Sequence, residues 1–307
     1  MALKNCVVIF GGGGQDGIFL NELLLSRGYK VFVFTHSGSE IGPAIDVSDF
    51  NTVENTIQKY CPDIVFHLAA KSSTRHEFVL ENHKAIVDGA LAIIEAVDRH
   101  VPNSKVFLAS SALVFKSEGG LINERCQLVT DTAYAMARVE ALQIARYYKQ
   151  RGRKVYVGFL FNHESPLRPP NSVARQVARN VVEIKNGISS KLVIGNASII
   201  KEWAWAGDIA NAIHCFLMQD DIYEICIGDG IGISIYEYAA ACCDAVGISL
   251  EKYLEEPPEF KAEYPMLING SEKIRALGWE PKVNLEQLAI KMINAELDMV
   301  NPNGLKI

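Results

Sequence analysis

The stretch Val7-Val8-Ile9-Phe10-Gly11-Gly12-Gly13-Gly14-Gln15-Asp16-Gly17 decides the fold of this chain. Its four apolar residues predict a buried strand, and the glycines predict a tight turn into an amphipathic helix. Gly11, Gly14 and Gly17 keep a three-residue spacing, which lets backbone approach a pyrophosphate and places the phosphates on the N–H groups of the helix N-terminus. Because a second strand follows at 30–34, we predict dinucleotide binding rather than a merely flexible turn.

Length and composition restrict the class of protein. The 307 residues are 49% hydrophobic, enough for one large or two small globular domains. The net charge of −6 gives no electrostatic reason to expect nucleic acid or an anionic membrane. The first four residues lead straight into a strand and no apolar run reaches spanning length, so we expect a cytoplasmic protein. The seven cysteines include no CxxC pair and are expected to be reduced, and the scattered histidines predict no metal site.

Predicted strands and helices alternate through most of the chain. We predict strands that end at Asp46 and that cover 62–70, 105–111, 155–161 and 224–228, and helices over 50–60, 80–100, 132 onward, 207–218 and 284–299. This alternation predicts an α/β fold, a doubly wound parallel Rossmann sheet with a smaller C-terminal α/β substrate-binding domain. We place the dinucleotide-binding domain at 1–161 with a returning segment at about 197–228, and the substrate-binding domain at 162–196 and 229–307.

The second strand ends where the adenosine ribose of a dinucleotide lies. Thr35, His36 and Ser37 stand there, without the acid that binds the ribose 2′-OH of NAD or the arginine that binds the 2′-phosphate of NADP. These side chains leave the choice of cofactor open. Further along, the small pair Ala69-Ala70 would let backbone pass close to the cofactor.

Candidate catalytic residues follow the strand over 105–111. This strand ends in Ser110-Ser111, and the carboxyl ends of parallel strands face the ligand crevice. In the long helix after it, a spacing of four places Tyr134 and Arg138 on one face. A lone Tyr-x-x-x-Arg is more often a packed ring and a solvated charge, but the serine-ended strand before it favours a catalytic role.

Several segments resemble the extended short-chain dehydrogenase/reductase superfamily and, within it, the GDP-mannose 4,6-dehydratases (the NAD-dependent epimerase/dehydratase family). Gly14-Gln15-Asp16-Gly17 resembles the Gly-Gln-Asp-Gly of that branch, and Phe161-Asn162-His163-Glu164-Ser165-Pro166 resembles its Phe-Asn-His-Glu-Ser-Pro. The segments 192–203 and 277–281 are similar to two further motifs of the branch, and the resemblance covers essentially the entire chain. It makes the predicted substrate-binding domain a nucleotide-sugar-binding one.

The resemblance implies a role for each matched position. Ser111 would hydrogen-bond the 4-oxygen of the sugar, and Tyr134 would exchange a proton with it while hydride moves between C4 and nicotinamide. Arg138 would assist Tyr134. The cofactor-binding residues would be Gly11, Gly14, Gln15, Asp16, Gly17, Thr35, His36, Ser37, Asp46, Val47, Ala69, Ala70, Lys71, Tyr134 and Arg138. The substrate-binding residues would be Lys71, Ser72, Ser111, Asn162, His163, Val173, Arg175 and Lys201.

Two departures from the family concern catalysis. The family strand Ala-Ser-Thr-Ser-Glu-Leu-Tyr-Gly corresponds to 109–116 here, with Leu113 in place of the glutamate that is thought to remove the C5 proton and help water leave C6. Leucine has no titratable group, so it performs neither step, and His163 or Glu164 is the alternative base. Arg138 replaces a lysine that bonds the nicotinamide ribose; arginine retains the charge but cannot shed a proton.

Further departures concern the ligands. Lys71 replaces a glutamine and would either bind the sugar or lie on the rim. Lys261, in the stretch Phe260-Lys261, stands where relatives carry an arginine that clamps the diphosphate, and Lys201 replaces another arginine on the nucleotide side. His36-Ser37 replace the paired arginines that favour NADP, so we expect NAD(H) or NADP(H) with a preference for NAD.

These observations predict an NAD(P)-dependent oxidoreductase acting at C4 of a GDP-linked manno-type sugar, hexose or heptose. It would be a C4 dehydrogenase or 4-ketoreductase without dehydration, and surface or capsular polysaccharide synthesis is the setting that the resemblance implies. The alternatives are a GDP-mannose 4,6-dehydratase that uses another acid–base group and a non-catalytic cofactor-binding protein. The resemblance also implies a homodimer, through paired long helices, or a homotetramer.

Overall fold

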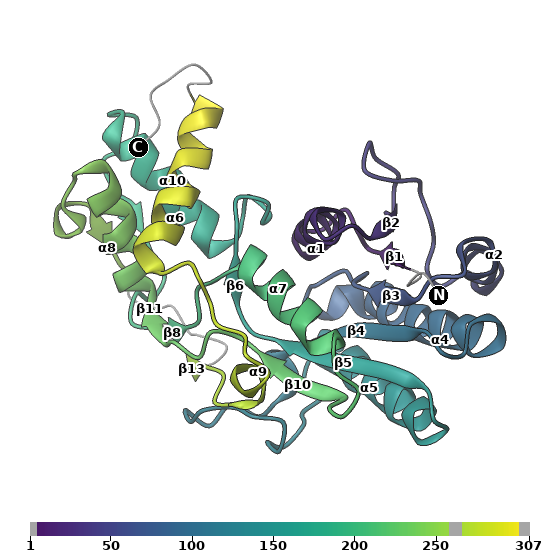
Figure 1. Cartoon of the computed structure of the whole chain (residues 1–307). Coiled ribbons are helices and arrows are strands. Elements are labelled where there is room, and N and C mark those ends of the chain that lie inside the picture. Colours follow the sequence, from purple (N-terminus) through teal and green to yellow (C-terminus); the bar gives the residue numbers. More distant parts are fainter. Residues whose placement is uncertain (1–4, 258–265, 301–307) are drawn as a thin grey trace.

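The computed structural model describes residues 5–257 and 266–300, and its centre is one six-stranded sheet (Figure 1). All neighbouring strands are parallel, in the order β10-β5-β4-β3-β1-β2. The strands are β1 (Cys6–Phe10), β2 (Lys30–Phe34), β3 (Ile64–His67), β4 (Lys105–Ser111), β5 (Lys154–Leu160) and β10 (Glu224–Ile227). This arrangement confirms the predicted α/β Rossmann sheet.

Helices cover both faces of this sheet (Figure 1). The helices α1 (Gln15–Ser26) and α7 (Ala206–Leu217) pack on one face, and α2 (Phe50–Tyr60), α4 (Gly89–His100) and α5 (Ala133–Gln150) pack on the other. Alternate residues of a strand point to opposite faces, so Val7 and Ile9 enter one apolar core and Val8 and Phe10 the other. Both faces of the first strand are therefore buried. None of the described helices is long and apolar enough to cross a membrane.

A separate core lies beside the sheet, in the lobe on the left of Figure 1. It is built from α6 (Val173–Lys185), α8 (Ile235–Val246) and α10 (Leu285–Val300), with Trp203 stacked on Tyr238 at 4.0 Å between ring centroids. Its short strands are β7 (Leu192–Val193), β8 (Ile200–Lys201), β11 (Ile233–Ser234), β12 (Leu254–Glu255) and β13 (Met266–Leu267). The pair β6 (His163–Glu164) and β9 (Ala204–Trp205) lies between this lobe and the sheet, and α7 and β10 return the chain to the sheet. The predicted division into two domains stays our proposal.

Two predicted elements differ from the structure. The prediction of a strand ending at Asp46 is wrong, because the segment 35–46 forms only two isolated bridges, between Thr35 and Ala44 and between Ser39 and Gly42. The predicted helix over 80–100 is divided into α3 (Val79–Asn82), a π-helical segment (His83–Asp88) and α4. The remaining short helices are His76–Phe78, Ala112–Val114, Leu250–Lys252 and α9 (Lys273–Ala276). Asp49 caps α2 by accepting a hydrogen bond from the N–H of Asn51.

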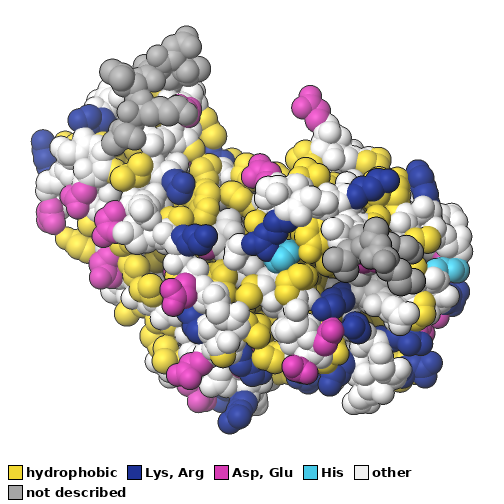
Figure 2. Space-filling view, in the orientation of Figure 1, with side chains coloured by type: hydrophobic (Ala, Val, Ile, Leu, Met, Phe, Trp, Pro, Cys, Tyr) yellow, Lys and Arg dark blue, Asp and Glu magenta, His cyan; other side chains and the backbone are white. Residues whose placement is uncertain are grey.

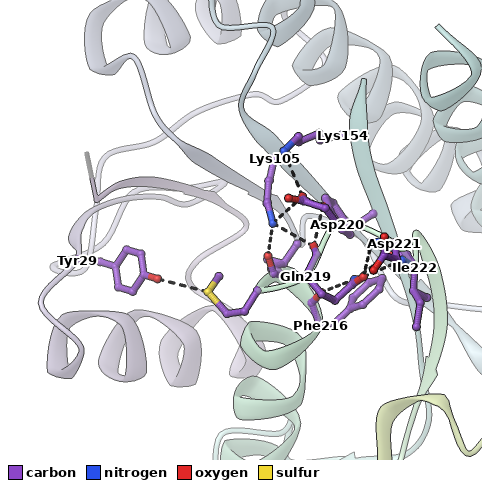
Figure 3. Close-up of polar contacts among 11 residues, drawn as sticks. Tyr29, Lys105, Lys154, Phe216, Gln219, Asp220, Asp221 and Ile222 are labelled. Carbon is purple, nitrogen blue, oxygen red and sulfur yellow. Dashed lines mark hydrogen bonds and ion pairs between the residues drawn. The ribbon is translucent and has the colours of Figure 1, made fainter. Parts of the chain in front are cut away.

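A polar cluster joins α7 to the amino ends of β4 and β5 (Figure 3). The Lys105 ammonium donates to the carbonyl oxygens of Leu217 at 2.6 Å and Gln219 at 3.1 Å, which supplies partners for carbonyls at the end of α7. The Asp220 carboxylate accepts a hydrogen bond from the Tyr156 hydroxyl at 2.9 Å and pairs with Lys105 and Lys154 at 3.1 and 3.2 Å. These contacts, the Tyr156 hydrogen bond above all, lower the pKa of Asp220 to about 2.

We predict that Asp220→Asn destabilises the fold at neutral pH. Because folding lowers the pKa of Asp220, the ionised carboxylate stabilises the folded protein at pH values above the unfolded-state pKa of Asp220. This stabilisation is lost as the pH falls toward 2. Since the Asp220 side chain is 57% exposed, solvent screening limits the effect to about 1 kcal/mol in the free energy of unfolding. Urea denaturation at pH 7 and below pH 4 should show that the difference in the free energy of unfolding between wild type and Asp220→Asn is smaller at the lower pH. Asp221→Asn is the control, and an equal loss in both variants would contradict the prediction.

Candidate active site

The glycine turn, residues 11–17, brings three backbone segments into close contact. Gly11 has φ +84°, and a Cβ there would lie 2.5 Å from the backbone nitrogen of Ala69. A Cβ on Gly17 would collide with the Cα of Gly12. Gly14 differs, because a Cβ there would meet only the Gly11 carbonyl oxygen, at 3.6 Å. The turn is thus closed on the side of the sheet and open beside Gly14.

The N-terminus of α1 fits the pyrophosphate of a dinucleotide. Gly14 is the N-cap residue, and the N–H of Ile18 donates the first bond of the helix to the Gly14 carbonyl at 3.0 Å. The N–H groups of residues 15–17 precede this bond, so they are the donors that a helix N-terminus offers to an anion. With the Ala69 backbone against Gly11, this geometry fits a nicotinamide dinucleotide.

The side chains of Gln15 and Asp16 contact the second family-like motif. The Asp16 carboxylate lies 2.7 Å from Nε2 of His163, and the Ser165 hydroxyl donates to Oε1 of Gln15 at 2.6 Å. Nε2 of Gln15 donates to the His163 carbonyl at 3.3 Å. The structure therefore places these two predicted cofactor-binding side chains, and His163, in contact with one another. Their backbone groups remain at the start of α1.

The adenosine end holds the residues that follow β2. Thr35 is buried and donates to the Gly42 carbonyl, whereas His36 and Ser37 are exposed. Asp46 is also exposed, and its carboxylate accepts hydrogen bonds from the hydroxyl and N–H of Ser48, which lower the pKa of Asp46. Val47 is buried in the core below.

Tyr134 and Arg138 meet the end of β4. The Arg138 guanidinium lies 5.0 Å from the centroid of the Tyr134 ring and donates from Nη1 to the Ala109 carbonyl. Both side chains are buried, and Nε of Arg138 has no hydrogen-bond partner in the described part of the chain. Ser111 Oγ accepts a hydrogen bond from the N–H of Leu113 at 3.2 Å, so its own hydrogen stays available to a ligand. The structure brings these three predicted catalytic residues to one edge of the sheet.

A neutral histidine lies behind this group. Burial and, to a smaller extent, the Arg138 charge lower the pKa of His67 to about 4. Its Nε2 lies 3.2 Å from the Ile86 carbonyl, and its Nδ1 is buried without a partner among the described residues. Arg138 is therefore the nearby cation at neutral pH.

No carboxylate stands at the position where the family has its glutamate. Leu113 is half-buried and packs on the core below α5. Of the two alternative bases, His163 is bonded at both ring nitrogens. The Glu164 carboxylate is buried between Nε of Arg168 at 3.2 Å and Nζ of Lys201 at 3.6 Å. Both alternatives are thus engaged in contacts within the chain.

Asn162 and Lys201 lie on the predicted substrate side. Nδ2 of Asn162 is buried without a hydrogen-bond partner in the described residues, as expected of a donor that awaits a ligand. Lys201 is mostly buried beside Glu164, and this burial lowers the pKa of Lys201 although Glu164 opposes the shift. In Figure 2, the surface between the two lobes is hollowed, and lysine and arginine side chains gather there.

Arg175 serves a different contact from the one predicted. Its Nε and Nη2 bind the Glu296 carboxylate of α10 at 2.8 Å, and its Nη1 donates to the Arg168 carbonyl at 3.2 Å. The side chain thus joins α6 to α10, and Val173 is exposed at the start of α6.

The loop after β3 carries Lys71 and Ser72. Lys71 is exposed, with Nζ 4.7 Å from the centroid of the Phe78 ring, and Ser72 has φ +53°. Lys261 lies outside the described residues. Among the described residues, no group of three or more His, Cys, Asp or Glu side chains could hold a metal ion.

Sequence reasoning overlooked Arg168, which contacts Glu164 through its side chain and Arg175 through its carbonyl. Its spacing of four from Glu164, just beyond the motif 161–166, was the available signal.

Solved structures share the fold of this chain. The chain superposes on UDP-glucose 4-epimerase of Thermus thermophilus in complex with NAD with a TM-score of 0.81 at 22% identity, covering 95% of this chain and 98% of that one. It superposes on RMD from Pseudomonas aeruginosa complexed with NADPH with a TM-score of 0.84 at 18% identity, covering 96% and 99%. These neighbours are enzymes of the short-chain dehydrogenase/reductase superfamily, and the chain shares their fold.

Sequence comparison then gives the family. The family model described as GDP-mannose 4,6 dehydratase matches residues 8–292, so the chain belongs to that family. It is 28% identical over 327 residues to GDP-mannose 4,6 dehydratase 2 of Arabidopsis thaliana, covering 96% of this chain and 88% of the relative. It is 25% identical over 363 residues to GDP-mannose 4,6-dehydratase of Vibrio cholerae, covering 99% and 96%. The chain is an NAD(P)-dependent enzyme of this superfamily, as predicted.

We predict that Gly17→Ala weakens NADH binding by about tenfold or more, because the added Cβ displaces the backbone of Gly12 within the glycine turn. Gly120→Ala is the matched control, since a Cβ there meets open space. Titration of protein fluorescence with NADH measures both. Binding by Gly17→Ala within about twofold of wild type would show that the turn does not touch the cofactor.

Proposed function

We propose that the protein exchanges hydride at C4 of a GDP-linked manno-type sugar. The observation that carries this proposal is that Tyr134, Ser111 and Arg138 lie at the carboxyl end of β4, and that the neighbouring strand β3 leads to Ala69, against which the glycine turn packs. A bound nicotinamide supplies the partner for the hydride. The protein itself binds the sugar, orients its 4-oxygen and moves the proton.

The roles of the three residues follow from their contacts. The free hydrogen of Ser111 Oγ donates to the sugar 4-oxygen, because the Leu113 N–H already occupies a lone pair of that hydroxyl. The Tyr134 hydroxyl takes or gives the proton of the 4-oxygen. Arg138 faces the Tyr134 ring as a fixed charge, and because a guanidinium does not release its proton it takes no part in proton relay.

The proposed GDP side uses Asn162 and the cations beside it. The unpartnered Asn162 amide supplies a donor, and Lys201 and Arg168 supply positive charge for the diphosphate. The names of the relatives, which are GDP-mannose dehydratases, support this choice of nucleotide. Arg175 acts indirectly, by holding the Arg168 carbonyl against α6.

The fate of the 4-ketone distinguishes two candidates. Family membership favours 4,6-dehydration, as a GDP-mannose 4,6-dehydratase performs it, and we take this as the first candidate. Leu113 favours the second, a C4 dehydrogenase or 4-ketoreductase without loss of water, because Glu164 and His163 are both engaged elsewhere. A dehydratase of this chain therefore needs an acid–base group in place of Leu113, for which Glu164 and His163 are the alternatives.

We also propose a homodimer formed through α4 and α5. Leu91 on α4 and Met136 and Tyr147 on α5 are apolar and exposed. Met136 and Tyr147 are about three helical turns apart and so share one side of α5. Such a stripe on adjacent helices suits burial against a second copy.

We predict turnover of GDP-mannose with NAD or NADP, read by mass spectrometry and nicotinamide absorbance. A product lighter by one water with no net change in cofactor indicates dehydration. A product lighter by two hydrogens, with reduced cofactor, indicates C4 oxidation alone. Tyr134→Phe should slow either reaction by roughly a hundredfold or more, because the proton of the 4-oxygen has no partner. Full activity in Tyr134→Phe, or no change with any GDP-sugar including a GDP-heptose, would refute the proposal and favour a non-catalytic protein.

We predict that Leu113→Glu introduces or accelerates loss of water, since it places a carboxylate where the family has one. Leu113→Gln matches its size without a titratable group and should leave the product distribution as in wild type. The measurement is the fraction of 6-deoxy product by mass. If wild type already forms that product at the rate of Leu113→Glu, the second candidate is excluded and another base acts.

A further inference from the structure

Two family-like motifs, far apart in the chain, are bonded to each other. Gln15 and Asp16 begin α1, and His163 and Ser165 belong to the segment that leaves the sheet after β5. Three side-chain bonds join them: Asp16 to Nε2 of His163, Gln15 to the His163 carbonyl, and Ser165 to Gln15. The residues joined are 147 to 150 positions apart. This contact lies where the sheet meets the second lobe, near the label β6 in Figure 1.

The bonds of His163 require an imidazolium. Its Nδ1 lies 2.7 Å from the Phe161 carbonyl and its Nε2 lies 2.7 Å from the Asp16 carboxylate, and both partners are acceptors only. A neutral imidazole has one N–H, so losing the proton would turn a lone pair toward one of these oxygens. The His163 side chain is 11% exposed, which leaves little access for water to replace the lost bond.

The charges around His163 agree with this protonation state. Burial opposes the imidazolium, but the Asp16 charge and the two hydrogen bonds outweigh it, so the pKa of His163 is raised. Arg168 also faces the ring and acts against the charge. Arg168 pairs with the Glu164 carboxylate, which also pairs with Lys201. Asp16 is thus the carboxylate that keeps the ring charged.

We propose that His163 is a positioning residue that joins the glycine turn to Asn162, so that the pyrophosphate site and the nucleotide-sugar side are held in one geometry. Asp16 fixes the ring from α1, and the Phe161 carbonyl fixes it from the segment between β5 and β6 that also carries Asn162. The part of this proposal that concerns the nucleotide sugar rests on the proposed function, whereas the part that concerns NADH binding does not.

The first test compares NADH affinities of three variants at pH 7. Asp16→Ala removes the bond to Nε2, and His163→Phe removes both ring bonds but keeps a ring; each should weaken NADH binding by about tenfold. Asp16→Asn should rescue binding, because the amide donates to the Nε2 lone pair of a neutral ring whose Nδ1–H still reaches Phe161. Glu54→Ala is the matched control, since Glu54 binds His100 at 2.9 Å on another part of the surface.

The second test is the pH profile of NADH binding between about pH 7 and pH 9. In wild type, affinity should fall as His163 loses its proton, because the lone pair then faces the Asp16 carboxylate. In Asp16→Asn the profile should be flat, since the amide suits the neutral ring. This readout does not depend on whether Asp16→Ala folds.

The outcomes separate this inference from the proposed function. The inference is supported if His163→Phe binds both NADH and GDP more weakly than wild type, and if Asp16→Asn keeps the NADH affinity that Asp16→Ala loses. If wild type binds NADH and the variants match it, or if melting temperatures fall with no change in affinity, His163 is structural only and the inference is overturned. If wild type binds neither NADH nor NADPH, both this inference and the proposed function fail.

Discussion

The close packing of backbone at the glycine turn is the constraint on which the rest of the structure depends. Gly11 lies against Ala69, so β1, β3 and the start of α1 share one small volume. Glycine has no Cβ, so the backbone at Gly11 and Gly17 can approach its neighbours this closely. As a result, α1 begins next to the sheet and its N-terminus points at the crevice. The side chains at the start of α1 can then reach across to 163–165, which places the second lobe relative to the first.

The proposed catalytic group differs from the family pattern in residue type, while the fold is unchanged. Arg138 contributes both a contact to Tyr134 and a bond to the Ala109 carbonyl, so it anchors α5 to β4 as well as facing the ring. A lysine has no planar fork with which to do both. Leu113 then adds apolar surface beside Ser111. Under the proposed function, these changes alter proton handling and keep the position of the groups that bind the 4-oxygen.

The sequence predicted what depends on local pattern. Glycine spacing, the apolar run 7–10 and the alternation of predicted strands and helices were sufficient for β1, α1 and the parallel sheet. The direction of the Gln15 and Asp16 side chains could not be predicted, because their partners lie about half the chain away. The π-helical turn at 83–88 has no signal in residue type. The engagement of Arg175 likewise depends on Glu296, a partner that no motif indicates.

The buried pair of Arg175 and Glu296 has a consequence for the order of folding. The two residues are 121 positions apart, and their side chains are only 8% and 5% exposed. Until α10 docks, α6 carries a guanidinium that can be buried only at high cost. The hydrogen-bonded strands of the six-stranded sheet are complete at β10, although Leu267, Ile274 and Trp279 also enter its two cores. During synthesis all strands of the sheet are therefore available before α10, whereas the lobe that buries Arg175 can close only once α10 has been made.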